Sequence, residues 1–261
     1  MVSRRRSQLE ITTLILELDL GNTRVKWRIV KDDVQVMDKG VAELSELLNG
    51  HFPAAWCVDI RRARIASVLS RNTETIFAEQ WQSQYNFSVE FARSSAQCGG
   101  VVNAYSDVTR LGVDRWLALL AAYNINRCAA VIVDVGTALK VDAVSDAGLH
   151  LGGYIIPGPL LMERALLEGT DRVRFESAQV LSSIALGVDT RSCVQNGSAA
   201  ASVGAVLIAL EEIRNKLGRQ PAIYLTGGAG DLLATHLARA NVVDIFFRPD
   251  LVLDGLRWAL P

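Results

Sequence analysis

Cysteine and histidine are scarce in this sequence, and neither is arranged for a metal centre. The four cysteines, Cys57, Cys98, Cys128 and Cys193, form no CxxC pair, and the three histidines are equally scattered. Zinc sites need closely spaced ligands of these two types, so the sequence gives no indication of one. Widely separated cysteines indicate reduced thiols, and we expect a cytoplasmic protein.

The sequence also lacks an excess of positive charge and any long apolar run. Its formal net charge of -1 argues against nucleic acid as a partner, because binding phosphates requires a basic surplus. No stretch approaches about 18 uninterrupted apolar residues, so no membrane span is predicted. Glu17 and Asp19 interrupt the first apolar segment too early for a signal peptide. Residues 1–13 show no periodicity, and we interpret them as an N-terminal extension.

Neither a Walker A pattern nor a GxGxxG sequence is present, but two acidic turns of one design are. Leu14–Thr23 reads LILELDLGNT, and Val131–Asp142 reads VIVDVGTALKVD. Each joins an apolar strand to an Asp, a Gly and a Thr. The glycine lets the backbone approach a ligand closely, and the threonine hydroxyl can donate to a phosphate oxygen. Two such units half a chain apart predict a duplicated fold that closes on a shared phosphate and metal.

The first turn carries groups suited to the phosphates of ATP. Gly21 and Asn22 offer backbone N–H groups, Thr23 offers a hydroxyl, and Lys26 offers a positive charge. Asp19 is left to hold Mg²⁺, directly or through water. The alternative interpretation is a plain Asn-Thr turn that closes a hairpin.

Three other segments add candidate groups. Asp134 and Thr137 repeat the carboxylate and hydroxyl of the first turn, and Thr226–Gly228 follows a short apolar strand, where its backbone suits an adenine or ribose. Asp114 and Arg115 open a predicted helix. In one interpretation Asp114 only caps the helix and Arg115 pairs with its neighbour. In the other, Asp114 is a base for a hydroxyl acceptor and Arg115 binds an anionic group.

The order of apolar patterns predicts an α/β layer fold whose second half repeats the first. Three hairpin strands come first, followed by alternating helices and strands. The predicted strands cover residues 14–20, 25–30, 34–37, 63–68, 87–91, 131–133, 139–144, 149–156 and 222–225. The predicted helices cover residues 41–48, 73–85, 114–123, 160–167, 199–217 and 230–240, with a last helix from Leu251.

The candidate segments together resemble a known family. The motifs DLGNT at 19–23, GVDRW at 112–116, DVGTA at 134–138, GGYIIPGPLL at 152–161 and TGG at 226–228 have the order and spacing of type III pantothenate kinases. The resemblance covers nearly the whole chain from Leu14 onward. It implies the fold of the actin, Hsc70 and sugar-kinase superfamily, with RNase H-like domains at residues 14–125 and 126–261 and a cleft between them.

The resemblance implies an activity and its requirements. The expected reaction is transfer of the ATP γ-phosphate to pantothenate, the first step of coenzyme A biosynthesis, by a homodimer that needs Mg²⁺ and a monovalent cation, K⁺ or NH₄⁺. Another small-molecule kinase of the same superfamily, or a regulatory relative without transfer activity, remains an alternative, because fold alone does not settle function.

The resemblance also assigns roles to residues. It implies that Asp114 is the general base, that Asp134 binds the monovalent cation, and that Thr137 contacts the nucleotide. The expected ATP-binding residues are Asp19, Leu20, Gly21, Asn22, Thr23, Arg24, Val25, Lys26, Thr137, Gly227 and Gly228. The expected pantothenate-binding residues are Tyr105, Gly112, Val113, Asp114, Arg115 and Thr190, with Thr190 near the dimer interface.

One residue departs from the family pattern. Members usually carry threonine at the position of Lys140, within the motif DxGTAxTxD. A lysine so close to the nucleotide turn either pairs with phosphate or points away along its strand, and the sequence leaves both possibilities open.

Overall fold

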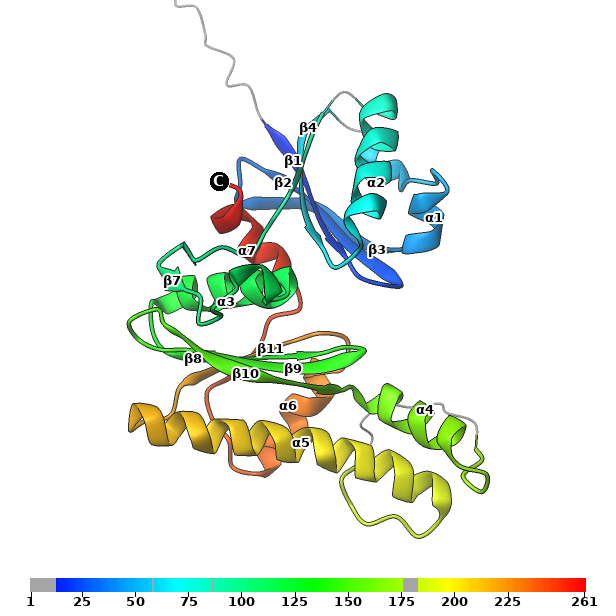
Figure 1. The fold of residues 1–261 in the computed structure, drawn as a ribbon, viewed down its shortest axis with the longest axis vertical. Helices are drawn as coiled ribbons and strands as arrows, with labels where there is room; N and C mark the ends of the chain where they lie inside the picture. Colours follow the sequence, from blue (N-terminus) through cyan, green and yellow to red (C-terminus); the bar gives the residue numbers. More distant parts are fainter. Residues whose placement is uncertain (1–12, 58, 86, 176–182) are drawn as a thin grey trace, which may run out of the picture. The chain divides into compact units, whose positions relative to one another are not determined.

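A computed structural model of the chain describes residues 13–57, 59–85, 87–175 and 183–261 (Figure 1). The predicted extension at residues 1–13 lies outside the described residues except for Thr13. The chain divides into two compact units, one up to Arg93 with Leu260–Pro261 added, the other Ser94–Ala259. This division comes earlier than the expected one after residue 125, because helix α3 (Val113–Asn126) packs with helix α7 (Leu251–Ala259) in the second unit.

The first unit is a five-stranded sheet with helices, in the order β3-β2-β1-β4-β5. Strands β1 to β3 form an antiparallel meander, and β4 and β5 run parallel to β1. The strands are β1 (Leu14–Leu20), β2 (Arg24–Lys31), β3 (Gln35–Glu43), β4 (Ile60–Ser67) and β5 (Ser88–Phe91). The helices are α1 (Leu44–Leu48), the 3₁₀ turn η1 (Ala54–Cys57) and α2 (Arg71–Gln84).

The core of the first unit follows from strand alternation and from aromatic side chains. Leu16, Leu18 and Leu20 are fully buried and belong to one apolar cluster, as expected when alternate residues face one side of a sheet. Trp56 and Trp81 join it with ring centroids 5.1 Å apart in an edge-on arrangement. This apolar layer fixes the register of β1, and with it the position of Asp19.

The second unit repeats this topology, with the strand order β10-β9-β8-β11-β12. Its central strands are β8 (Ala130–Val135), β9 (Ala138–Val144), β10 (His150–Pro157), β11 (Ala222–Thr226) and β12 (Ile245–Phe247). Its helices are α3, α4 (Pro159–Gly169), α5 (Thr190–Leu217), α6 (Gly230–Arg239) and α7. A small hairpin, β6 (Gln97–Cys98) and β7 (Val101–Val102), and the turn η2 (Val108–Arg110) precede α3. The matching orders confirm the predicted duplicated α/β fold.

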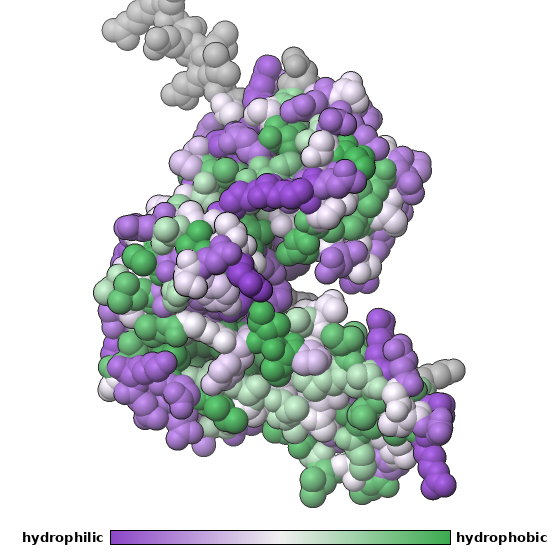
Figure 2. Space-filling view, in the orientation of Figure 1, coloured by the Kyte–Doolittle hydropathy of each residue, from purple (hydrophilic) through white to green (hydrophobic). Residues whose placement is uncertain are grey.

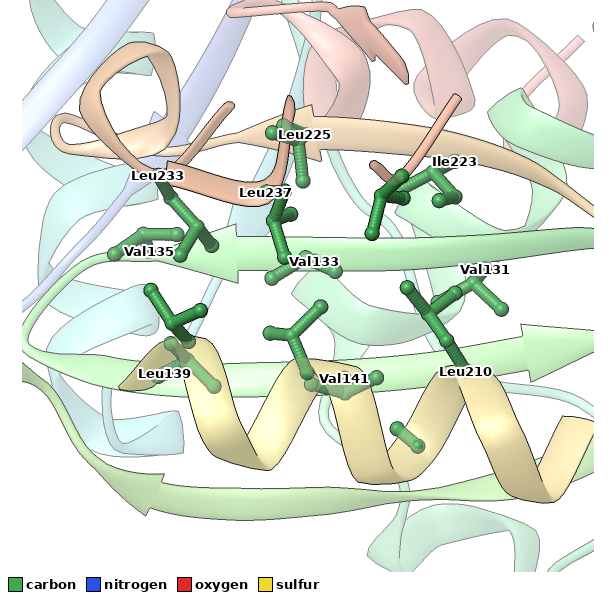
Figure 3. Packing of buried hydrophobic residues seen from close by; sticks show 14 of the residues in the cluster. Val131, Val133, Val135, Leu139, Val141, Leu210, Ile223, Leu225, Leu233 and Leu237 are labelled. Carbon is green, nitrogen blue, oxygen red and sulfur yellow. The ribbon is translucent and has the colours of Figure 1, made fainter. Parts of the chain in front are cut away.

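Helices cover both faces of the second sheet, with α3 and α7 on one side and α5 and α6 on the other (Figure 1). On the side of α5 and α6, the inward residues of the strands interlock with leucines of both helices, as Figure 3 shows. The labelled residues are Val131, Val133, Val135, Leu139, Val141, Leu210, Ile223, Leu225, Leu233 and Leu237. Alternation therefore turns Asp134, Lys140 and Asp142 to the opposite face, which α3 covers.

Helix α5 is longer than its prediction. It begins at Thr190, nine residues before Ala199, because Asp189 and Ser192 form a capping box at this point. Ala199, Val203 and Ala209 are buried in the core of this unit, whereas Ala200 and Ala201 are exposed. By length and composition, α5 alone among the helices of described residues could cross a membrane, a property that core helices share.

Strand β3, helix α1 and strand β12 also differ from the sequence-based predictions, and the short elements η1, β6, β7 and η2 were not predicted. Strand β3 continues to Glu43, so α1 covers Leu44–Leu48 only and the predicted helix start at residue 41 is wrong. β-Branched Val41 pairs with Lys26 of β2, and this sheet pairing prevails over helical spacing. Strand β12 was not predicted, because three residues give too short a pattern.

A buried ion cluster lies across the centre of the first sheet. Glu17 of β1 is opposite Arg28 of β2 and Arg64 of β4 in register, and all three side chains are buried. Arg28 Nε donates to Glu17 Oε2 at 2.6 Å, and Arg64 Nη1 lies 3.5 Å from Glu17 Oε1. Burial raises the pKa of Glu17, although both arginines act in the opposite direction. Glu17 therefore pairs with two buried arginines at a cost in burial, and Arg64 also donates to Asp33.

We expect Glu17→Gln to lower the free energy of unfolding by about 3–5 kcal/mol, because it removes the buried carboxylate that pairs with two buried guanidinium groups. The matched control is Glu43→Gln, whose partner Arg24 lies 3.4 Å away on the exposed surface. That change should cost less than about 1 kcal/mol. Chemical denaturation measures both values, and equal costs for the two substitutions would contradict the expectation.

Candidate active site

The side chain of Lys140 joins two carboxylates on the α3 face of the second sheet. Lys140 on β9 pairs in register with Asp134, near the end of β8. Its Nζ donates to Asp134 Oδ2 at 2.7 Å and to Asp114 Oδ2 at 2.8 Å. Asp134, predicted to bind a monovalent cation, therefore holds an ammonium group of this chain. Lys140 neither points away along its strand nor stands apart from the candidate carboxylates.

The start of helix α3 sets the position of Asp114. Gly112 is the N-cap, so Asp114 occupies the first turn, where the helix dipole favours a negative charge. Asp114 Oδ1 accepts the backbone N–H of Arg115 at 2.8 Å. An ionised carboxylate has about four lone-pair positions, so each oxygen of Asp114 still has one available for an acceptor hydroxyl.

A second ion pair holds α3 to β9. Arg115 donates to both oxygens of Asp142, with Nε–Oδ2 at 2.7 Å and Nη2–Oδ1 at 2.6 Å. Its Nη1 donates to the Tyr105 hydroxyl at 2.9 Å, and His150 Nε2 lies 3.0 Å from Asp142 Oδ1. The Tyr105 and His150 rings stack with centroids 6.0 Å apart. Three of the five guanidinium N–H donors of Arg115 are thus used, and two remain for an anionic ligand.

The pKa shifts follow from this arrangement. Burial alone would lower the pKa of Lys140, but the carboxylates of Asp134 and Asp114 outweigh it and hold the value above its ordinary range. Burial also opposes ionisation of Arg115, and Asp142 outweighs it in the same way, so the pKa of Arg115 is raised. Both cations therefore stay charged at neutral pH.

The nucleotide candidates of the second unit lie at one edge of its sheet. Thr137 is exposed in the turn between β8 and β9, and its carbonyl accepts the N–H of Gly158 at 2.8 Å. Thr226 pairs in register with Asp134, so Gly227 follows directly beside that carboxylate. Gly227 has φ +84°, and a Cβ there would lie 2.6 Å from Asp134 Oδ1. Glycine is required at this position, both for its backbone conformation and for space.

The corresponding turn of the first unit lies between β1 and β2. Asp19 pairs in register with Lys26, and Gly21 N–H donates to the Arg24 carbonyl at 3.1 Å, which closes the turn. Asn22, Thr23 and Arg24 are exposed at its tip, whereas Val25 is buried in the core, as is Leu20. The N–H of Gly21 is thus used within the turn, contrary to its expected role as a donor to ATP. The exposed tip offers its other donors to a ligand, and Leu20 and Val25 serve packing.

The structure does not bring every predicted residue next to Lys140 and its partners Asp114 and Asp134. Thr190 is exposed at the first residue of α5, and no hydrogen bond among the described residues links it to Asp114 or Asp134. Within the described part of the chain, no group of three His, Cys, Asp or Glu side chains is arranged to hold a metal ion.

Asp142 and His150 belong to this cluster but were not predicted as site residues. A signal for Asp142 was present: in ALKVDAV the apolar residues alternate, so Lys140 and Asp142 share the face that is not apolar. Two opposite charges on the inner face of a strand require partners. His150 gave no such signal, because its partner is eight residues earlier on the neighbouring strand.

Comparisons by sequence identify one family. The sequence model of the family "Type III pantothenate kinase" matches residues 15–211. A type III pantothenate kinase of Pseudomonas aeruginosa is 36% identical over 251 residues, which cover 95% of this chain and 99% of the relative. A type III pantothenate kinase of Pseudomonas putida is 36% identical over 252 residues, with the same coverage.

Comparisons by structure support the fold. The activator of the 2-hydroxyisocaproyl-CoA dehydratase from Clostridium difficile, with bound ADPNP, has a TM-score of 0.51 at 12% identity and covers 94% of this chain and 92% of its own. An ethanolamine utilization protein from Carboxydothermus hydrogenoformans has a TM-score of 0.52 at 11% identity, with coverage of 92% and 88%. At such identities the likeness concerns the fold alone.

We expect Gly227→Ala to destabilise the second unit by about 1–3 kcal/mol, because alanine is strained at this φ and its Cβ would lie 2.5 Å from the Val135 carbonyl. The neighbouring Gly228 is the matched control: it is exposed, and its added Cβ would meet nothing within 4 Å. Gly228→Ala should change stability by less than about 0.5 kcal/mol. Thermal or chemical unfolding decides, and a tolerated Gly227→Ala would contradict the expectation.

Proposed function

The chain belongs to the family of type III pantothenate kinases, and from this premise we propose how its residues transfer the γ-phosphoryl group of ATP to pantothenate. The reaction is the ATP-dependent phosphorylation of pantothenate, which begins coenzyme A biosynthesis. The observation that carries the proposal is the position of Asp114, at the start of α3 and within hydrogen-bond distance of a cation shared with Asp134. A fixed carboxylate beside the nucleotide edge of the sheet is what a hydroxyl acceptor requires.

Asp114 orients and deprotonates the acceptor hydroxyl. The phosphoryl transition state is loose, so the proton leaves late and the carboxylate acts mainly by holding the hydroxyl in line with the phosphorus. The Arg115 backbone N–H on Oδ1 and the Lys140 ammonium on Oδ2 hold the Asp114 carboxyl group in one orientation. One lone pair on each oxygen remains available for the substrate.

Pantothenate is an anion, and the other members of its candidate site suit that charge. Arg115 retains two N–H donors beyond those given to Asp142 and Tyr105. The half-buried Tyr105 ring, held through its hydroxyl, offers an apolar face and a polar edge. Gly112 and Val113 bring the helix N-terminus to the same place, where its dipole favours a carboxylate or a polarised hydroxyl.

The two acidic turns bind the nucleotide in this proposal. The tip residues Asn22–Arg24 and Lys26 contact phosphates, and Thr137, Gly227 and Gly228 contact the remainder of ATP. Mg²⁺ fits Asp19, because Mg²⁺ is usually held by one or two carboxylates together with waters and substrate phosphates. When bound, Mg²⁺ neutralises charge on the phosphates. The monovalent cation does not fit at Asp134, since the Lys140 ammonium lies 2.7 Å from its Oδ2, and no step depends on it.

We also propose a homodimer. Leucines on α4 and apolar residues just before α5 are exposed, and Figure 2 shows green patches among white and purple ones over the lower right part, where α4 and the start of α5 lie in Figure 1. The exposed residues are Leu160, Leu161, Leu166, Leu186 and Val188. Thr190 is exposed beside them in sequence, consistent with its expected role near the interface. A monomeric mass by light scattering would exclude this arrangement.

A cytoplasmic location, with neither nucleic acid nor membrane as partner, completes the proposal. The net charge of -1 and the scattered cysteines support it. The apolar length of α5 does not oppose it, because the buried side of that helix packs on its own sheet. Recovery of the protein with the membrane fraction of lysed cells would count against this location.

We expect the purified protein to form ADP from ATP only when pantothenate is present, and to stop when EDTA removes Mg²⁺. Excess Mg²⁺ should restore the rate, because the metal offsets phosphate charge that few basic side chains are placed to balance. A coupled ADP assay over a panel of acceptors measures this. Turnover of a sugar but not of pantothenate would favour another kinase of the superfamily, and nucleotide binding without ADP release would favour a regulatory relative.

We expect Asp114→Asn to lower kcat by on the order of 10²–10⁴, because the amide cannot accept the hydroxyl proton. The affinity for ATP should change little, which fluorescence titration with a nucleotide analogue can test. Asp231→Asn is the matched control, because Asp231 also occupies the first turn of a helix, α6, and is exposed. The control should keep normal turnover; near-normal turnover of Asp114→Asn itself would refute the assignment.

A further inference from the structure

We propose that the ammonium group of Lys140 is a built-in replacement for the monovalent cation, so that phosphoryl transfer by this protein requires no added K⁺ or NH₄⁺. The proposal rests on the proposed function, since it concerns the charge balance of the same site. It reverses the requirement that the family resemblance implies. The structural basis is one side chain that bridges Asp134 and Asp114.

The backbone places the ammonium at this position. Lys140 and Asp134 are direct cross-strand neighbours in the antiparallel pair β8–β9, where opposite charges attract. Alternation along β9 turns Lys140 to the face that α3 covers, and Asp114 in the first turn of α3 is there to receive it. The side chain is about one-fifth exposed, so the contact lies largely out of water. The bridge is therefore set by three elements of regular structure.

The two carboxylates leave no equivalent place for a second cation. Both Oδ2 atoms accept from Lys140, while Asp114 Oδ1 accepts the Arg115 N–H and Asp134 Oδ1 faces the backbone at Gly227. A metal ion inserted between the Oδ2 atoms would displace the ammonium or lie against a like charge. Asp134 therefore already has a cationic partner that belongs to the chain, without any ion from solution.

An alkylammonium group can do what the ion does. It has the charge of K⁺, is similar to it in size, and is the tethered form of NH₄⁺, which the resemblance implies as an activator. A compact ammonium carries three N–H donors. Two are given to Asp134 and Asp114, so the third can reach a phosphate or acceptor oxygen. A tethered charge also requires no capture from solution, so its occupancy does not depend on salt.

The departure from the family pattern agrees with this geometry. The usual threonine at position 140 is neutral and too short to carry a charge between the two carboxylates. Exchange of threonine for lysine therefore adds one positive charge at the place where the cation ligand Asp134 points. Lysine in place of threonine should remove the requirement for a monovalent cation, and threonine in place of lysine should create it.

The first experiment compares salts with the unmodified protein. Pantothenate-dependent ADP formation is measured in KCl, NH₄Cl, NaCl and tetramethylammonium chloride at equal ionic strength. The rates should agree within about twofold, the variation expected from general screening. Activation by K⁺ or NH₄⁺ of about tenfold or more over tetramethylammonium would overturn the proposal, since it would show a functional site for a free ion.

The second experiment restores the ion site. Lys140→Thr should lose on the order of 10² in kcat in tetramethylammonium chloride, as for removal of one electrostatic contact, and should recover most of it in K⁺ or NH₄⁺. Lys140→Met should show the same loss without recovery, because methionine fills the space and carries no charge. Lys216→Thr, an exposed lysine of α5, is the control and should behave as the unmodified protein. A Lys140→Thr protein that no cation restores would mean that Lys140 serves the substrate directly, and the proposal would fail.

A readout without substrates separates this inference from the proposed function. K⁺ should raise the Tm of Lys140→Thr above its value in tetramethylammonium, and leave the Tm of the unmodified protein unchanged, because only the variant binds the ion. Absence of pantothenate turnover in every salt, together with this Tm pattern, would refute the kinase assignment but keep the ion replacement. Turnover of pantothenate together with a K⁺-dependent Tm of the unmodified protein would keep the kinase assignment and refute the ion replacement.

Discussion

The contact of one ammonium group with two carboxylates organises the second unit. Asp134 belongs to β8, Lys140 to β9 and Asp114 to α3, so the contact joins two strands and the helix that covers them. Without the lysine, two carboxylates would face each other in a largely buried space with no cation between them. The ammonium therefore fixes the positions of both carboxylates, as well as the position of α3.

Arg115 and Asp142 form a second ion pair between the same helix turn and the same face of the strand. Together the two pairs place three carboxylates and two cations between α3 and β9. Buried ion pairs of this kind contribute little net stability, because desolvation offsets most of the attraction. What they provide is geometry: each charge fixes the rotamer of the next. A site whose polar groups are fixed before substrates bind needs less reorganisation during transfer.

The sequence predicted the fold where apolar patterns are long, and failed where tertiary contacts decide. Strand 14–20 was predicted to the residue because its alternation is unbroken, and β11 nearly so. The start of α5 was missed, because glycine and asparagine at 196–197 mask a helix that its cap and its packing support. Asp19 and Asp134 could be found because they lie where apolar strands end, and Asp114 because it opens a predicted helix. The partner of Lys140 could not, since Asp114 lies 26 residues away and only the packing of α3 brings it near.

The duplication gives Lys140 a counterpart in the first unit, which explains how lysine can be tolerated at a position where the family pattern has threonine. In the first unit Asp19 of β1 is opposite Lys26 of β2, and in the second unit Asp134 of β8 is opposite Lys140 of β9. An aspartate–lysine cross-strand pair is therefore compatible with this strand pair at the same edge of the sheet. In the second unit the start of α3 adds Asp114, so the lysine serves two carboxylates. A lysine at position 140 thus needed no new backbone geometry, and the fold could replace a mobile ion with a side chain by changing one residue.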